Sequence, residues 1–481
     1  MLFNSHEFIL IFIPLVLSTL FFVRKVGHNY YISILIFYSF IFYLYWNIYD
    51  LILILISILA NFIFANIIIF KKNKYLLVAF IVLNLLVLIY FKYFIFFLSL
   101  IGIITDKKID LPLGISFFTF TQIVLLIDIY SNKVKEIRFN NFVLFVVYFP
   151  HLIAGPLLHY KDLTPQFQND NTKYLNKNNI LIGIVIFTIG LAKKVLLADN
   201  FAPYVNLIFY DYNTKESINS IYAWTGAVAY SMQLYFDFSG YTDMAIGISK
   251  MLNINLPINF NSPYKSKNII DFWRRWHITL SNLLRDYLYI PLGGNKNRFI
   301  SVFITMILGG LWHGASLTFL LWGLIHGILI YLNYIWIEIK RLFKISDNFI
   351  PDIIAIAITF LCVTFAWVFF RADNINSGIR IINDMCDFFK LILNYETFNS
   401  EIHKYISLIK EANLSIRLLI LLLVSSCIII WKMPSTYSFI NNENNMIKFT
   451  KSYFQIIFFS ILFLISVLSI KSKKEFLYFN F

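Results

Sequence analysis

The sequence predicts an all-α polytopic membrane protein, and two observations carry this prediction. Hydrophobic residues make up 59% of the 481 residues and charged residues only 14%, whereas soluble domains carry about 25% charged residues. Several apolar runs also approach or reach the roughly 20 residues that a helix needs to cross about 30 Å of hydrocarbon. The apolar excess must therefore face lipid.

The apolar runs predict the membrane segments in order. The clearest cores are residues 30–46, 51–70, 76–91, 180–192, 299–312, 315–337, 353–370, 415–431 and 454–470. No cleavage site of small residues follows the opening run Phe8 to Val23, so we expect a retained first helix and not a secretion signal. With further segments at 142–158 and 221–247, we expect about 11 to 13 membrane helices, re-entrant segments included. We predict one domain over residues 1–481, with 373–412 as a surface loop that carries short interfacial helices.

The net charge of +14 indicates basic loops on the cytoplasmic side and no nucleic acid partner. Basic clusters such as Arg24/Lys25 and Lys193/Lys194 share that side if a segment between them is re-entrant. Residues 221–247 are the candidate, because Asp237, Ser239 and Gly240 interrupt the run. Irregular backbone at membrane depth survives only where protein or a water-filled cavity covers it. We therefore predict a re-entrant hairpin there.

The three cysteines, Cys362, Cys386 and Cys427, have no metal-binding or redox spacing. We expect them to be packing residues. The sequence predicts no metal site, and it offers no Cys beside His and Asp for a thiol-based mechanism.

His313 is the first candidate for chemistry, because an ionisable group at membrane depth is a functional candidate by default. It follows Gly309-Gly310-Leu311-Trp312 and precedes Gly314, so there is room for close helix packing or for a substrate beside the ring. Burial keeps an imidazole neutral and able to accept a proton, as a general base must. The alternative is a core histidine bonded to a backbone carbonyl.

His277 lies in a basic and aromatic stretch, Lys265 to Arg298, whose pattern is that of an amphipathic surface. Such a surface either anchors the chain at the membrane or binds phosphate through the guanidinium groups of Arg274 and Arg275. Coenzyme A carries phosphates and is cytoplasmic. Asp237 should face the interior, where it either binds substrate or braces a broken helix.

A series of motifs in this order resembles the membrane-bound O-acyltransferase family, in its bacterial alginate and peptidoglycan O-acetylation branch. The motifs are Met1 to Ser5, Leu111 to Phe117, Phe149 to Pro156, Asp237 to Tyr241, Arg274 to His277, Leu311 to Ala315, Trp322 to Gly327 and Trp367 to Ala372. The sequence departs from the branch at His151, where a polar non-histidine residue is usual, and at His159, where arginine is common.

The resemblance implies a central tunnel with His313 as the essential catalytic residue and His277 as the second active-site histidine. It implies acetyl-CoA as the donor substrate with no bound cofactor, a cell-surface polysaccharide as the acceptor, a periplasmic or membrane-anchored acetyltransferase partner, and the bacterial inner membrane. Residues expected to bind substrate or coenzyme A are Arg274, Arg275, Trp276, Trp312 and Asp237.

Two alternatives stay open. The acyl group could be D-alanine from a carrier protein, transferred to teichoic acid, or the chain could be a transporter or flippase, although no internal repeat is visible.

His326 lies roughly 220° around a continuous helix from His313 and is therefore expected to be structural.

Overall fold

The computed structural model describes residues 1–23, 28–103, 105, 109–152, 155–169, 172, 174, 176–214, 218–346, 349–393, 395–436, 438, 452–471 and 477. These residues form helices joined by turns, and no strand occurs among them. The all-α prediction is confirmed. The Arg24/Lys25 cluster and residues 153–154 lie outside the described residues.

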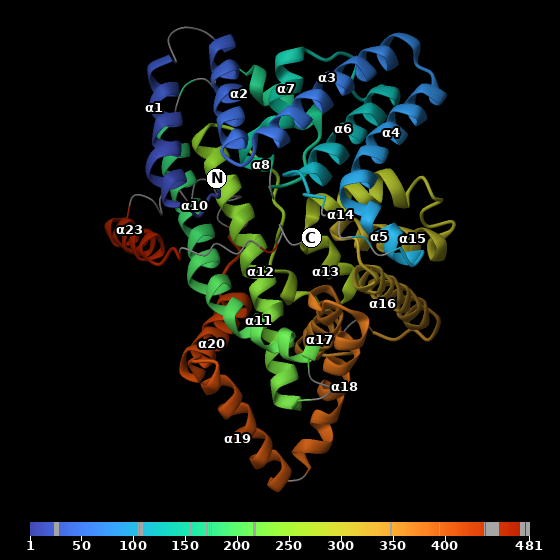
Figure 1. Ribbon diagram of the computed structural model, residues 1–481, viewed down its shortest axis with the longest axis vertical. Coiled ribbons are helices and arrows are strands. Elements are labelled where there is room, and N and C mark those ends of the chain that lie inside the picture. Colours follow the sequence, from blue (N-terminus) through green and yellow to red (C-terminus); the bar gives the residue numbers. More distant parts are fainter. Residues whose placement is uncertain are drawn as a thin grey trace. The chain divides into compact units, whose positions relative to one another are not determined.

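The chain divides into two compact units, which we describe separately (Figure 1). Unit 1 comprises Met1–Ala192, Tyr241–Ile258 and Ile440–Ile470. Its helices are α1 (Ile13–Val23), α2 (His28–Leu44), α3 (Ile48–Lys71), α4 (Lys74–Leu88), α5 (Phe94–Leu100), α6 (Ile115–Tyr130), α7 (Phe139–Val147), α8 (Phe149–Leu152), α9 (Tyr160–Gln168), α10 (Lys177–Ala192) and α23 (Tyr453–Leu468).

Unit 2 comprises Lys193–Gly240, Asn259–Phe439 and Lys471–Phe481. Its helices are α11 (Asp199–Thr214), α13 (Ile269–Arg275), α14 (Ile278–Leu284), α15 (Arg298–His313), α16 (Leu317–Leu342), α17 (Asp352–Arg371), α18 (Ile375–Ile392), α19 (Tyr395–Glu411) and α20 (Ile416–Lys432). A further helix, α12 (Ser220–Met251), contributes its first part to unit 2 and its last part to unit 1.

Five helical segments of the described chain are long and apolar enough to cross a membrane, or six if the bent pair of α19 and α20 forms one span. Five shorter apolar helices accompany them. Each of the nine predicted apolar cores lies on one helix or extends beyond it by no more than two residues at either end, except 76–91, which continues from α4 into the π-helical turn Ile89–Tyr93. The chain is therefore a multi-pass membrane protein, while the count of 11 to 13 membrane helices and the single-domain organisation stay predictions.

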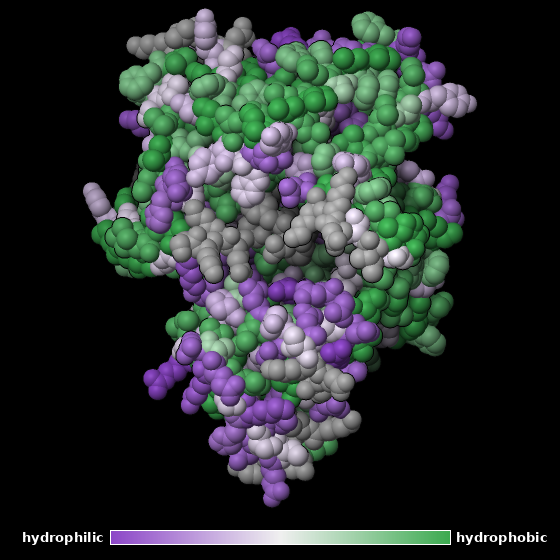
Figure 2. All heavy atoms as spheres, in the orientation of Figure 1, coloured by the Kyte–Doolittle hydropathy of each residue, from purple (hydrophilic) through white to green (hydrophobic). Residues whose placement is uncertain are grey.

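Polar side chains inside unit 1 satisfy one another where α3, α4 and α6 lie side by side (Figure 1). The amide nitrogen of Asn61 donates to Asn84 Oδ1 at 2.9 Å and to Gln122 Oε1 at 2.7 Å, and Asn84 donates back to Asn61 at 2.9 Å. These groups need internal partners because hydrocarbon offers none. The outer faces of α3 and α4 carry exposed apolar side chains, seen as green surface in Figure 2.

The prediction of a re-entrant hairpin at 221–247 is wrong, because α12 runs unbroken from Ser220 to Met251. Asp237, Ser239 and Gly240 lie within this helix, and all three are buried. A continuous helix satisfies its own backbone groups. Because the surrounding protein covers the polar side chains of this helix, the helix does not need to break at them. The polar residues mark burial and not a turn.

The predicted segment at 142–158 is also not one span. Helix α7 ends at Val147, and Tyr148 leaves helical geometry with a ψ of 103° before the single turn α8. Pro150 supplies no N–H and its ring clashes with a preceding helical turn, so α7 does not continue through it. The apolar run reflects burial, since every residue from Asn141 to Leu152 is buried.

Residues 373–412, predicted as a surface loop with short interfacial helices, form the two helices α18 and α19. Hydrophilic side chains gather over these helices in Figure 2. The polarity of this stretch therefore belongs to helical surfaces.

Glycines bring α15 and α16 into close contact. A Cβ at Gly310 would lie 2.2 Å from the carbonyl oxygen of Phe319, and one at Gly323 would lie 2.3 Å from that of Met306. A Cβ at Gly309 would meet only the tip of Leu284, at 3.2 Å. Of the two uses predicted for these glycines, close helix packing is the one observed at Gly310.

We expect Gly310→Ala to lower the free energy of unfolding by about 1–3 kcal/mol, because the backbone it meets cannot move without separating the helices. Thermal unfolding of the purified protein measures this. Gly309→Ala is the matched control and should have little effect. Equal effects of the two substitutions would contradict the close crossing.

Candidate active site

His277 lies in unit 2 at the junction between α13 and α14, with a φ of 44° and a ψ of 53°. This left-handed conformation is uncommon for residues other than glycine, and strained positions of this kind concentrate at functional sites. The side chain is 1% exposed, and its ring packs edge-on against Phe238 of α12 with centroids 4.7 Å apart. The local backbone thus turns this histidine into the interior.

Asn259 fixes the tautomer of His277. Its Oδ1 accepts from the backbone N–H of Thr279 at 3.2 Å and from the Thr279 hydroxyl at 2.9 Å. An N–H can only donate, so the atom that faces it is the amide oxygen. His277 Nδ1, 3.1 Å from the same oxygen, must therefore be the donor. This leaves Nε2 of the neutral ring as a proton acceptor.

Burial lowers the pKa of His277 from 6.5 to about 3, because the charged form is desolvated. The contribution of the neutral ring to stability is therefore complete above pH 6.5. Between pH 6.5 and pH 3 this histidine takes up a proton in the unfolded chain but not in the folded protein. The contribution to stability therefore declines by about 1.4 kcal/mol for each pH unit as the pH falls through this range.

We expect thermal unfolding curves between pH 7 and pH 5 to show a smaller decline in Tm for His277→Gln than for the parent protein. Some decline should remain, because burial also lowers the pKa of His151, to about 4. Identical pH dependence in the two proteins would show that His277 is not held neutral.

His313 is the last residue of α15 and is 6% exposed. Aromatic rings surround it: Trp312 at 5.0 Å, Phe370 at 5.1 Å and Trp322 at 5.3 Å between centroids. The His277 ring lies 6.5 Å from the His313 ring, and Trp312 contacts both, since its centroid is 6.0 Å from that of His277. The two predicted histidines therefore meet in one aromatic cluster.

The predicted site residues that precede His277 differ in how much of their side chains is exposed. Trp276 is buried beside the cluster, 4.9 Å from the ring of Trp367, whereas the side chain of Arg274 is exposed. Arg275 is partly exposed and pairs with Asp271, Nε to Oδ1 at 2.9 Å. Of the two arginines, Arg274 is thus the more accessible for an anionic ligand.

Asp237 is committed to an ion pair with Lys194, which also pairs with Asp199 at 2.7 Å. The side chains of Lys194 and Asp237 are 2% and 3% exposed. The sequence left open whether Asp237 binds substrate or braces a helix, and this pairing favours bracing. The neighbouring residue, Phe238, is the one that contacts His277.

His326 also belongs to the cluster, which the sequence prediction missed. It is fully buried, its Nδ1 accepts from Trp273 Nε1 at 3.3 Å, and its ring lies 4.9 Å from Trp322, which contacts His313 as well. The angle of roughly 220° between His313 and His326 applies only to one continuous helix, but α15 ends at His313 and α16 begins at Leu317. The intervening Gly314 was the signal for a break.

Two further histidines lie in unit 1 and have local roles. His151 Nε2 donates to the carbonyl oxygen of Phe145 at 2.8 Å in a buried setting. His159 lies 3.6 Å from Asp128, which also pairs with Lys133 at 3.2 Å. Across the described residues, no group of three or more His, Cys, Asp or Glu side chains has the arrangement of a metal site.

Comparison with known proteins decides the family. The sequence pattern of the membrane-bound O-acyltransferase family matches residues 40–378. The chain belongs to this family. It is an acyltransferase, and the transporter or flippase alternative is set aside.

Similar proteins of known name indicate which branches of the family this acyltransferase resembles. It is 37% identical to a peptidoglycan O-acetyltransferase of Helicobacter pylori over 100% of this chain and 98% of the relative. It is 40% identical to a probable alginate O-acetylase, AlgI, of Pseudomonas putida over 81% of each chain. It is also 33% identical to a teichoic acid D-alanyltransferase of Bacillus subtilis, over 54% of this chain and 68% of the relative.

Proposed function

We propose that this acyltransferase moves an acetyl group from cytoplasmic acetyl-CoA across the bacterial inner membrane to hydroxyls of a cell-surface polysaccharide. The observation that carries the proposal is the similarity to a peptidoglycan O-acetyltransferase along the whole chain. Peptidoglycan is the first candidate acceptor for that reason, and an alginate-like exopolysaccharide is the second. A periplasmic or membrane-anchored acetyltransferase partner relays the group if the polymer itself cannot enter the tunnel.

The two histidines supply the chemistry of the transfer. His313 takes the proton of the attacking hydroxyl, and the oxygen forms a bond to the thioester carbonyl carbon. The carbon–sulfur bond of the resulting tetrahedral intermediate then breaks, and the leaving thiolate receives the proton from the His313 imidazolium. His277 is held neutral with Nε2 as an acceptor, so it assists proton movement through this nitrogen or orients the thioester by packing of its ring, and not by donating a hydrogen bond to it.

The coenzyme site is assigned to the basic stretch that precedes His277. Guanidinium groups bind phosphate with two hydrogen bonds, and the exposed Arg274 is the better placed of the two arginines. Arg275 would have to exchange its carboxylate partner, Asp271, for phosphate. Trp276 and Trp312 line the aromatic cluster around the histidines and would pack against the substrate.

The test is to measure ester-linked acetate on purified peptidoglycan and exopolysaccharide from cells with and without the gene. We expect the acetate of one polymer to disappear with the gene and to return with the intact gene. Loss of esterified D-alanine from teichoic acid instead would support the alternative of D-alanyl transfer, which the similarity to a D-alanyltransferase keeps open. Unchanged esters on all three polymers would overturn the proposal.

A further inference from the structure

Two hydrogen-bond donors buried near His313 have no acceptor among the described residues. They are the indole Nε1 of Trp322 and the imidazole Nε2 of His326, and these residues are 1% and 0% exposed. Such donors are rare in folded proteins, because burial without a partner loses the hydrogen bond that water would supply. A ligand oxygen would satisfy both groups.

Trp273 fixes which nitrogen of His326 carries the proton. The indole N–H of Trp273 can only donate, and it lies 3.3 Å from His326 Nδ1. Nδ1 is therefore the acceptor, and the proton of the ring lies on Nε2. His326 thus presents a donor where His277 presents an acceptor.

Both donors lie on the buried face of α16, one helical turn apart. Residues i and i+4 of a helix are neighbours on its surface, and the rings of Trp322 and His326 lie 4.9 Å apart between centroids. The Trp322 ring lies 5.3 Å from that of His313 and at 90° to it. The two donors therefore line the cluster that holds the proposed general base.

The ring contacts of these donors offer no strong acceptor. The other rings in contact with one or both are those of Phe272, Trp273, Trp367 and Phe370. The face of an aromatic ring accepts an N–H only weakly. An oxygen that enters with the substrate would be a far better partner.

The proposed reaction needs donors at this place. When the hydroxyl oxygen attacks the thioester carbon, an electron pair of the carbonyl double bond moves to the carbonyl oxygen, which becomes negative. His313 accepts the hydroxyl proton, and His277 presents an acceptor nitrogen, so neither donates to this oxygen at that step. Preorganised N–H groups stabilise such an oxyanion.

We infer that Trp322 Nε1 and His326 Nε2 form the oxyanion hole of this acyltransferase and hold the carbonyl oxygen of the acyl group. The inference rests on the proposed function in one respect, the role of His313 as the base. Both N–H groups donate hydrogen bonds and keep their protons throughout. When the carbon–sulfur bond breaks, the electron pair returns from the oxygen to the carbonyl bond, and His313 gives its proton to the thiolate.

Substitutions by phenylalanine test the pair, because each keeps an aromatic ring and removes the N–H. Membranes that contain the full chain receive labelled acetyl-CoA at rising concentrations, and ester formation is measured per mole of chain. We expect Trp322→Phe and His326→Phe each to lower kcat by about 10²- to 10³-fold with little change in KM, as when an oxyanion-hole donor is removed. Parent-like kcat in either variant would overturn the inference.

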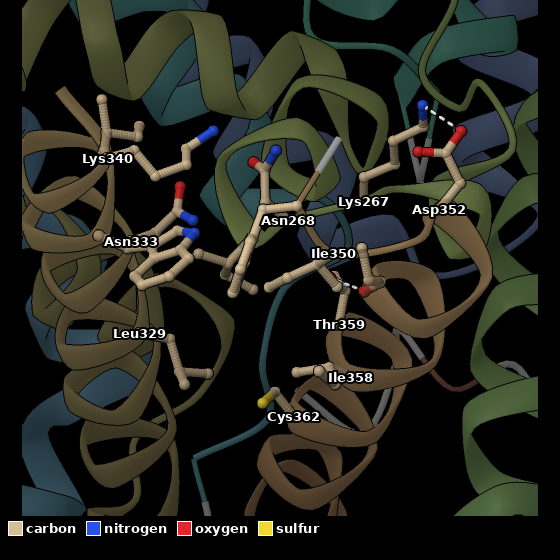
Figure 3. Close-up of a pocket in the computed structure, with 15 residues that line it drawn as sticks. Lys267, Asn268, Leu329, Asn333, Lys340, Ile350, Asp352, Ile358, Thr359 and Cys362 are labelled. Atoms are coloured by element: carbon tan, nitrogen blue, oxygen red, sulfur yellow. Dashed lines mark hydrogen bonds and ion pairs between the residues drawn. The ribbon is translucent and has the colours of Figure 1, made fainter. Parts of the chain in front are cut away.

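Trp336→Phe is the matched control on the same helix. Trp336 lines a cavity of about 460 Å³ between α16 and α17 (Figure 3), and neither Trp322 nor His326 lines that cavity. The variant also loses an indole N–H but should keep the parent kcat. A loss as large as that of Trp322→Phe would contradict a specific role for the Trp322 N–H.

Two further substitutions separate donation from packing at His326. Glutamine offers both an acceptor to Trp273 and a donor, whereas methionine has a similar length and offers no donor. His326→Gln should therefore recover much of the kcat that His326→Met loses, and equal kcat in the two would overturn the inference. Trp273→Phe, which removes the partner of Nδ1 and leaves the Nε2 proton, should keep most of the activity.

The spectrum of a bound carbonyl gives a readout that packing alone would not change. The probe is a ketone analogue of acetyl-CoA, with a methylene group between the sulfur and a ¹³C-labelled carbonyl, and infrared difference spectra record its C=O stretch. We expect the band at lower frequency in the parent protein than in Trp322→Phe or His326→Phe. An identical band in all three proteins would overturn the inference.

The parent chain tests the proposed function separately. If its membranes form esters of D-alanine and not of acetate, the proposed acetyl donor is wrong. The same variants are then compared for D-alanyl transfer, because that acyl group carries the same carbonyl, and the ratio of variant to parent kcat decides the inference.

Discussion

His313→Ala is expected to reduce acyl transfer by about 10²- to 10⁴-fold, the usual contribution of a general base. The ring ends α15 within an aromatic cluster, and His277 is its nearest predicted catalytic partner, at 6.5 Å between centroids. Alanine removes the proton acceptor while the surrounding aromatic residues keep the helix ends in place. The measurement is ester-linked acetate on the acceptor polymer in cells that carry only the variant.

A matched control separates chemistry from folding. His403, an exposed histidine of α19 in the same unit, should tolerate alanine with full transfer. The His313→Ala protein should be expressed and unfold thermally close to the parent, since the substitution leaves the glycine crossing of α15 and α16 untouched. Normal transfer by a folded His313→Ala protein would refute the assignment of His313 as the base.

Asp237→Leu is expected to lower the free energy of unfolding by about 3–5 kcal/mol. It removes one of two carboxylates from Lys194, whose side chain is 2% exposed, and so leaves a buried charge with less compensation. Thermal or denaturant unfolding in detergent measures the change. The neighbouring Phe238 packs on His277, so the same variant should also lose activity.

A double variant and an exposed ion pair serve as controls for this prediction. Lys194→Met together with Asp237→Leu should cost less than the sum of the two single substitutions, because both members of the pair are then apolar. Arg341→Gln breaks the exposed pair with Glu338, 77% and 47% exposed, and should cost no more than about 1 kcal/mol. An effect of Asp237→Leu as small as that of Arg341→Gln would show that the buried pair contributes little to stability.

Hydropathy alone predicted where the helices lie, because an apolar run long enough to cross hydrocarbon is a local property. Hydropathy gave wrong predictions for two segments, a single span at 142–158 and a re-entrant hairpin at 221–247. At the first, protein burial produced an apolar run that Pro150 divides, and at the second, polar residues sit inside an unbroken helix. Hydropathy does not distinguish lipid from protein as the surroundings of a side chain.

The sequence by itself determined the class of the protein and the motifs around His277 and His313, since composition and residue order are written in the chain. Only the tertiary structure decided that these histidines share one cluster with Trp312 and that Asn259 fixes the tautomer of His277. It also decided that Asp237 pairs with Lys194. The physical reason is that most of these contacts join segments far apart in the sequence, and sequence periodicity indicates which face a helix buries but not which side chain it meets there.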